Sequence, residues 1–120
     1  MCIRDRYRDR ITKFASISAR VGSIEDNELG GWYSYRASKS ALNMVLKGLS
    51  IEQKRSNPDS IIFGLHPGTV DSKLSKPFQK KDKKYFTPEF SAEKLVSVID
   101  TKTVADNGKI FDWDNKIIPY

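Results

Sequence analysis

Ile61-Ile62-Phe63-Gly64-Leu65 is the longest apolar run in the sequence, and His66-Pro67-Gly68 follows it directly. The run has the length of a buried strand, whereas a buried helix needs a longer one. Turn-forming residues stand on both sides of it, with Asn57-Pro58-Asp59 before it. A continuous apolar run between turns is typical of a parallel strand that is covered on both faces. This segment therefore predicts an α/β fold.

The residues before this strand predict a further strand and a helix. Residues 11–18 have strand character and lead into a polar, glycine-containing stretch. From about residue 34 to 54 the pattern becomes helical, because Ala37, Ala41 and Val45 recur every four residues. We expect this helix to carry an apolar stripe wide enough to bury one face in the sheet and another in a partner.

The residues after the strand predict a loop, a helix and a last short strand. Residues 69–86 are a lysine-rich loop, and Thr87-Pro88-Glu89 has the composition of a helix start, with threonine as the N-cap. That helix is expected to end near Asp100, with a strand at 109–113 and a tail at 117–120. The order strand, helix, strand, loop, helix, strand predicts a parallel sheet with right-handed crossovers.

Length, charge and composition limit the functions of the chain. Its 120 residues make at most one domain, and its formal net charge is +6. The excess is concentrated in the first ten residues and in residues 73–84, which hold six lysines and one aspartate, so we expect no nucleic-acid partner. No apolar window of about 18 residues is present, so we expect no membrane span. Cys2 and His66 are the single cysteine and histidine, which excludes a disulfide and a Cys/His zinc site within one chain.

The first ten residues do not fit the pattern of a fold. They alternate arginine with aspartate or tyrosine and show neither helical nor strand periodicity. We expect residues 1–10 to be a disordered or spurious tail, and residues 11–120 to form the folded part. The single thiol agrees with a reducing compartment, and we expect a cytoplasmic location.

Tyr35 and Lys39 are the residues with the clearest chemistry. They stand four positions apart, so a helix places the phenol and the ammonium on one face. A free tyrosine has a pKa of about 10 and is a poor proton donor at neutral pH, and a nearby cation lowers that pKa. The pair is therefore a candidate acid/base, although the spacing alone also occurs in solvated surface pairs.

Three segments together resemble the short-chain dehydrogenase/reductase family. They are Ser18-Ala19-Arg20-Val21-Gly22, residues 30–43 around Tyr35-Arg36-Ala37-Ser38-Lys39, and His66-Pro67-Gly68-Thr69-Val70. Their order and intervals are similar to the catalytic half of that family, in the branch of sniffer-type carbonyl reductases and C-factor proteins. The resemblance covers residues 11–120. It implies the C-terminal portion of a Rossmann-type, doubly wound parallel sheet whose N-terminal half is missing here.

The resemblance implies a role for each matched residue. Tyr35 matches the family's acid/base tyrosine, and Lys39 matches the lysine that lowers the tyrosine's pKa and binds the nicotinamide ribose. The turn Pro67-Gly68-Thr69-Val70 matches the segment whose backbone meets the nicotinamide carboxamide. The helix at 34–54 matches the one that such proteins use to form homo-oligomers. The implied cofactor is NAD or NADP, and the implied substrate is a small carbonyl compound or alcohol.

Two departures from the family pattern leave alternatives open. The usual catalytic serine falls on Ala19, so Ser18 is the first candidate to replace it and Ser23 the second, or neither serves. The glycines never form the Gly-x-x-x-Gly-x-Gly loop that a dinucleotide site needs. We therefore expect an NAD(P)-dependent oxidoreductase fragment that is inactive without the missing half. The alternative is a non-catalytic signalling or interaction protein of the same fold.

Overall fold

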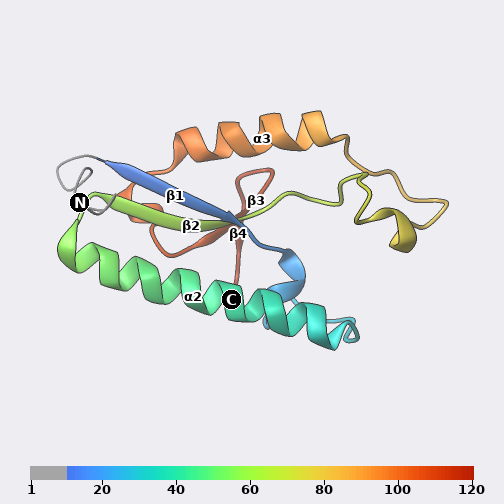
Figure 1. Cartoon of the computed structure of the whole chain (residues 1–120), viewed down its shortest axis with the longest axis horizontal. Helices are drawn as coiled ribbons and strands as arrows, with labels where there is room; N and C mark the ends of the chain where they lie inside the picture. The colour runs from blue at the N-terminus through green and yellow to red at the C-terminus, as the bar shows by residue number, and fades with distance from the viewer. Residues whose placement is uncertain (1–10) are drawn as a thin grey trace.

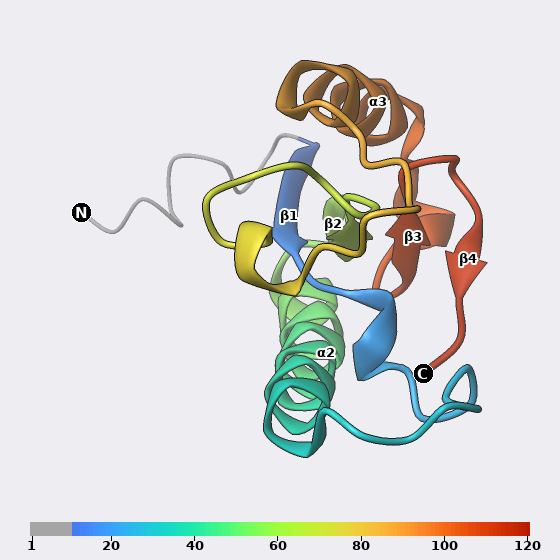
Figure 2. The same cartoon turned by 90° about the vertical axis from the view of Figure 1, so that its right-hand side faces the viewer.

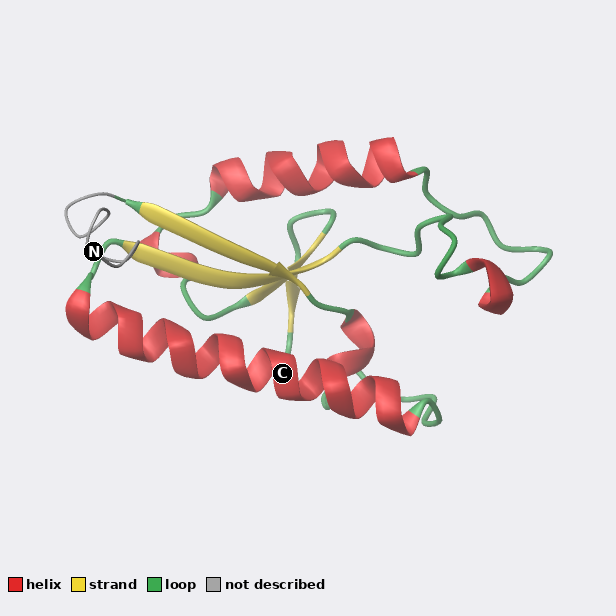
Figure 3. Ribbon diagram, viewed as in Figure 1, coloured by secondary structure: helices red, strands yellow, loops and turns green. Residues whose placement is uncertain are grey.

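The computed structural model describes residues 11–120 and shows a four-stranded sheet between two helices (Figures 1 and 3). The expectation for residues 1–10 lies outside the described part. The strands are β1 (Thr12–Ile17), β2 (Ser60–His66), β3 (Ile110–Asp112) and β4 (Ile117–Ile118), and they lie in this order across the sheet. The helices are α2 (Tyr33–Ser56) and α3 (Pro88–Thr101). Short 3-10 turns lie at Arg20–Gly22, Lys76–Phe78 and Val104–Asp106.

The first three strands run parallel, as the sequence predicts. β1 pairs with β2 over its whole length, and β2 pairs with β3 through three residue pairs. β4 is antiparallel to β3, with Ile118 opposite Ile110. The expectation of a tail at 117–120 was therefore incomplete, because Asn115 has a positive φ of 62° and turns the chain back onto β3.

β2 is the central strand, and its alternating side chains form two cores. Ile61, Phe63 and Leu65 are at most 1% exposed and pack with Val98 of α3. Ile62 points to the other face and packs with Leu46 of α2. The sheet is thus covered by α3 on one face and α2 on the other, as Figure 2 shows end-on.

The two helices begin in different ways. α3 begins as predicted, because the Thr87 side chain accepts a hydrogen bond from the Phe90 amide at 3.2 Å. α2 has no side-chain cap, and Trp32 before it has left-handed backbone angles of φ 53° and ψ 37°. This conformation is uncommon for a bulky residue, so the entry into α2 is a bent and locally strained turn.

Candidate active site

The parallel strands end on the same side of the sheet, and the first turns of α2 lie beside them. In Figure 1 the arrowheads of β1 and β2 point to the right, and the first turns of α2 lie below and to the right of them. The carboxyl ends of parallel strands are where open α/β sheets bind ligands. This end of the molecule contains all the site residues that the sequence analysis selected.

Tyr35 and Lys39 lie together on α2, and Lys39 contacts β1. The Nζ atom of Lys39 is 5.9 Å from the ring centroid of Tyr35, as the four-residue spacing predicts. The same ammonium donates a hydrogen bond of 3.4 Å to the carbonyl oxygen of Ile17, the last residue of β1. Tyr35 is 47% exposed, so its hydroxyl is accessible to a substrate.

Ser18 and Ser23 lie near this pair, but the hydroxyl of each already takes part in a hydrogen bond within the protein. Ser18 is 2% exposed and donates a hydrogen bond of 2.5 Å to Oδ1 of Asn43, which lies one helical turn beyond Lys39. The Ser23 hydroxyl accepts a bond from the amide of Asp26 and stabilises a turn. Ala19 is 7% exposed and offers no hydroxyl. Ser18 is therefore the better placed of the two, since it directly follows the residue that Lys39 contacts.

The turn at Pro67-Gly68-Thr69-Val70 is held firmly after β2. Gly68 has a φ of +79°, and a Cβ atom there would lie 2.5 Å from the ring of Phe86, so only glycine fits. The carbonyl of Pro67 accepts a bond from the Ser91 hydroxyl at 2.8 Å. The Phe86 ring packs edge-on against the Trp113 ring, with ring centroids 4.7 Å apart, and supports the turn.

The hydrogen-bond donors at the carboxyl ends of the parallel strands fit a nicotinamide nucleotide. Lys39 uses one of its three N–H groups on Ile17, which leaves donors for the hydroxyls of a ribose. Within residues 11–120, the backbone amides of Thr69 and Val70 have no acceptor, so they are available to a carboxamide oxygen. The residues present therefore suit the nicotinamide end of NAD(P).

Proteins of known sequence match nearly the whole chain. It is 38% identical over 108 residues to a 1-hydroxy-2-glutathionyl-2-methyl-3-butene dehydrogenase of Rhodococcus sp., covering 90% of this chain and 46% of that protein. It is 30% identical over 110 residues to the C-signal of Myxococcus xanthus, covering 92% of this chain and 62% of the relative. No protein-family model matches the chain.

Solved structures agree with these sequence matches. The NADPH-bound carbonyl reductase from chicken fatty liver superposes with a TM-score of 0.79 at 29% identity, over 90% of this chain and 42% of that one. The carbonyl reductase Sniffer of D. melanogaster gives a TM-score of 0.79 at 26% identity, over 98% of this chain and 46% of its own. The chain belongs to the short-chain dehydrogenase/reductase family.

This family member spans about half the length of the curated relatives it matches. The matched part contains the Tyr35–Lys39 pair and the 67–70 turn. In residues 11–120 no helix is long and apolar enough to cross a membrane. The same residues contain no group of three or more His, Cys, Asp or Glu side chains that could hold a metal ion.

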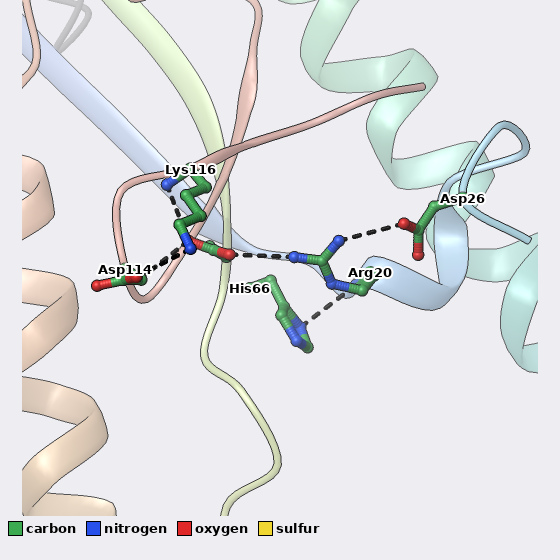
Figure 4. Close-up of polar contacts among 6 residues, drawn as sticks. Arg20, Asp26, His66, Asp114 and Lys116 are labelled. Atoms are coloured by element: carbon green, nitrogen blue, oxygen red, sulfur yellow. Dashed lines mark hydrogen bonds and ion pairs between the residues drawn. The ribbon is translucent and has the colours of Figure 1, made fainter.

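An ionic network that the sequence analysis missed joins the ends of three strands (Figure 4). Arg20, just after β1, forms ion pairs with Asp112 of β3 at 3.0 Å and with Asp26 at 3.3 Å. The amide of Arg20 also donates to Nδ1 of His66, the last residue of β2, at 3.3 Å. These residues are far apart in the sequence, so no local pattern indicates the network.

Gly22 allows α2 to approach the end of β1 closely. A Cβ atom at Gly22 would lie 2.8 Å from the backbone carbon of Lys39, and the Gly22 carbonyl accepts the Ser40 hydroxyl at 2.6 Å. We expect Gly22→Ala to lower the free energy of unfolding by about 1–3 kcal/mol, because the helix must move away at Lys39. Urea denaturation measures this change.

Gly48→Ala is the matched control for Gly22→Ala. No atom lies within 4 Å of a Cβ at Gly48, which is exposed in the middle of α2. Alanine there is expected to stabilise the protein by about 0.5–1 kcal/mol, because glycine is a poor helix former. Equal effects of the two substitutions would contradict the close approach at Gly22.

Proposed function

We propose that this chain carries the proton-transfer residues of an NAD(P)-dependent carbonyl reductase. The observation that carries the proposal is the ammonium of Lys39 beside the accessible ring of Tyr35, at the carboxyl end of β1. The free amides of Thr69 and Val70 support it, because they lie after the neighbouring strand. The similar carbonyl reductase from chicken fatty liver, whose structure holds NADPH, adds support for the cofactor class.

Each of these residues has its own role in the proposed reaction. NAD(P)H, held by Lys39 and the 67–70 turn, would supply a hydride to the carbonyl carbon of the substrate. Tyr35 donates its phenolic proton to the carbonyl oxygen, so that an alcohol forms. The positive charge of Lys39 stabilises the phenolate that remains. In the direction of alcohol oxidation, the Tyr35 phenolate accepts the proton back.

Two measurements test this function. The first is the transcript upstream of the Ile11 codon, where we expect an open frame encoding a strand, a Gly-x-x-x-Gly-x-Gly loop and a helix. The second is carbonyl-dependent oxidation of NADPH and NADH by the protein that this transcript encodes. A transcript that begins at Met1, together with a protein that binds neither nucleotide, would rule out the reductase.

We propose Ser18 as the residue that orients the carbonyl oxygen, with Ser23 as the alternative. In this role the Ser18 hydroxyl turns its hydrogen from Asn43 to the substrate, and Ser18→Ala is expected to lower kcat/KM by about 10²-fold, as the loss of one donor to a developing oxyanion does. Ser23→Ala is expected to leave kcat/KM nearly unchanged. Urea denaturation of the same variants separates a catalytic role of Ser18 from a structural one. If Ser18→Ala lowers the stability and leaves kcat/KM unchanged, the bond from Ser18 to Asn43 is only structural.

A non-catalytic signalling protein is the second candidate. The match to the C-signal of Myxococcus xanthus favours it, because this chain covers 62% of that protein. The alanine at position 19 favours it as well. A complete protein that has no nicotinamide affinity but binds a protein partner would support this function over the reductase.

We also propose that the protein forms a homo-oligomer through α2 and works in the cytoplasm. The side of α2 that faces away from the sheet is apolar and exposed, with Met44 74%, Val45 61% and Ile51 45% exposed. Ala37 and Ala41 continue this stripe. A charged residue at Val45 is expected to lower the oligomer's mass, as sedimentation measures it.

A further inference from the structure

The lysine-rich loop between β2 and α3 forms a half-open cavity that the proposed reaction does not use. The cavity has a volume of about 190 Å³. Its lining consists of Thr69, Ser75, Phe78, Lys80, Lys83 and Tyr85. Pockets that hold whole drug-sized ligands measure about 300–1,000 Å³, so this one suits a single substituent of a ligand.

The cavity lies beside the candidate active site. Thr69 belongs to the turn that we assign to the nicotinamide, and it also lines the cavity. Phe78 lines the cavity and packs edge-on against Trp32, with ring centroids 5.3 Å apart. Trp32 directly precedes α2, three residues before Tyr35. The loop and the start of α2 lie at the same end of the molecule, at the right in Figure 1.

Hydrogen bonds hold the loop around the cavity. Phe86 closes its base, because its amide donates to the Thr69 carbonyl at 2.9 Å and its carbonyl accepts from the Asp71 amide at 2.8 Å. The hydroxyl of Ser75 donates to the Val70 carbonyl at 2.6 Å. At the tip, the Lys80 amide donates to the Tyr85 hydroxyl at 2.7 Å, which fixes the turn that carries the lysines.

The lining is suited to an anion. Within residues 11–120, neither Lys80 nor Lys83 has an ion-pair partner, and Asp82 between them does not line the cavity. The Tyr85 hydroxyl accepts the Lys80 amide, so its own hydrogen is available to donate. Lys80 and Lys83 are exposed residues at the edge of this lining, so their ammonium groups and the phenol O–H would meet the acceptor oxygens of a carboxylate, while the Phe78 ring would contact an apolar linker.

We propose that this cavity binds the carboxylate of an anionic carbonyl substrate and thereby orients it toward Tyr35. This inference rests on the proposed function, since it names the substrate class of the same site. A flat linker such as a phenyl ring would pass Phe78 and Trp32 and bring the carbonyl group to α2. Lys80, Lys83 and Tyr85 are then the residues that determine specificity.

A matched pair of substrates tests the proposal. We expect the longer protein that contains this chain to reduce 4-carboxybenzaldehyde with a kcat/KM about tenfold higher than that for its methyl ester, because only the acid has the charge. The double variant Lys80→Gln/Lys83→Gln is expected to lose this preference. The control is Lys81→Gln/Lys84→Gln, which removes the same net charge from residues that do not line the cavity.

The other outcomes overturn the proposal in distinguishable ways. Equal turnover of acid and ester by the unaltered protein would leave the reductase function standing and remove the anion site. Equal losses in both double variants would show that only the bulk charge of the loop matters. An altered preference for NADPH over NADH in Lys80→Gln/Lys83→Gln would assign the cavity to the cofactor's phosphate.

A binding measurement separates this inference from the proposed function. If neither substrate is reduced, the reductase function fails, and binding of 4-(hydroxymethyl)benzoate is then decisive. The amide NMR signals of Thr69 and Tyr85 are expected to shift with this ligand in the unaltered protein. They are expected to stay in place in Lys80→Gln/Lys83→Gln. Unmoved signals in the unaltered protein would overturn the anion site.

Discussion

In the longer protein that contains this chain, Tyr35→Phe is expected to lower carbonyl-reducing activity by about 10²–10⁴-fold, since it removes the proton donor of the reaction. The phenylalanine ring keeps the contact with Lys39, whose Nζ lies 5.9 Å from the ring centroid. Because Tyr35 is 47% exposed, the free energy of unfolding is expected to change by less than about 0.5 kcal/mol. Steady-state kinetics and urea denaturation measure the two effects separately.

Tyr33→Phe is the control for this experiment. Tyr33 is 84% exposed, and two residues along a helix correspond to a rotation of about 200°, so its hydroxyl points away from that of Tyr35. We expect this variant to retain full activity. If Tyr35→Phe kept its activity within about threefold of the unaltered protein, proton donation by Tyr35 would be excluded.

The parts of the fold with a local signal were predictable from sequence. The apolar run at 61–65 predicted a strand that β2 confirms, and this strand is buried on both faces. Thr87 was predicted as an N-cap, and its side chain accepts the expected bond. Tyr35 and Lys39 lie on one face of α2, because a spacing of four residues on a helix is enough to place them there. In each case the interacting residues lie within a few positions of one another.

The periodicity of α2 did not show which face covers the sheet. Ala37, Ala41 and Val45 recur every four residues, but they are exposed. The face toward the sheet contains Leu46 together with the polar, buried Asn43. The periodicity therefore misses the buried face, because it includes a polar residue. Asn43 can be buried there because its side chain accepts a hydrogen bond from Ser18, in another part of the chain. Such a bond has no signature in the helix itself.

Long-range contacts explain what the sequence analysis missed. β4 has only two residues, which is too short for a strand pattern, and it forms because the turn at Asn115 returns it to β3. The network around Arg20 assembles from the ends of three strands. The cavity in the lysine-rich loop needs the pairing of Phe86 with Thr69 across the base of the loop. Only the folded chain brings these residues together.

The unfolding free energy is expected to fall by about 2 kcal/mol between about pH 7 and about pH 5 because of His66. Burial, together with the positive charge of Arg20, lowers the pKa of His66 to about 4, against the opposing effects of Asp112 and Asp26. The unfolded chain binds this proton below its ordinary pKa of 6.5, whereas the native state does not. Stability is therefore lost as the pH falls from 6.5 toward 4.

His66→Asn isolates this effect. The asparagine oxygen replaces Nδ1 as the acceptor for the Arg20 amide but carries no charge at any pH, so the variant is expected to lose about 2 kcal/mol less over the same interval. His66 is the single histidine, so its imidazole NMR signals report its pKa directly. A folded-state pKa near the ordinary value, or equal acid sensitivity of the two proteins, would contradict the assignment.

Acid sensitivity at His66 also affects the candidate site. His66 is followed directly by Pro67 and Gly68, and its ring accepts the amide of Arg20 just after β1. A protonated imidazole can no longer accept this bond, so one contact between the ends of β1 and β2 is lost next to Ile17, which Lys39 contacts. Because the native imidazole takes up its proton only near pH 4, we expect nicotinamide affinity to fall there, below the interval in which most of the stability is lost. His66→Asn is expected to reduce both losses, because asparagine takes up a proton neither in the unfolded chain nor in the native state.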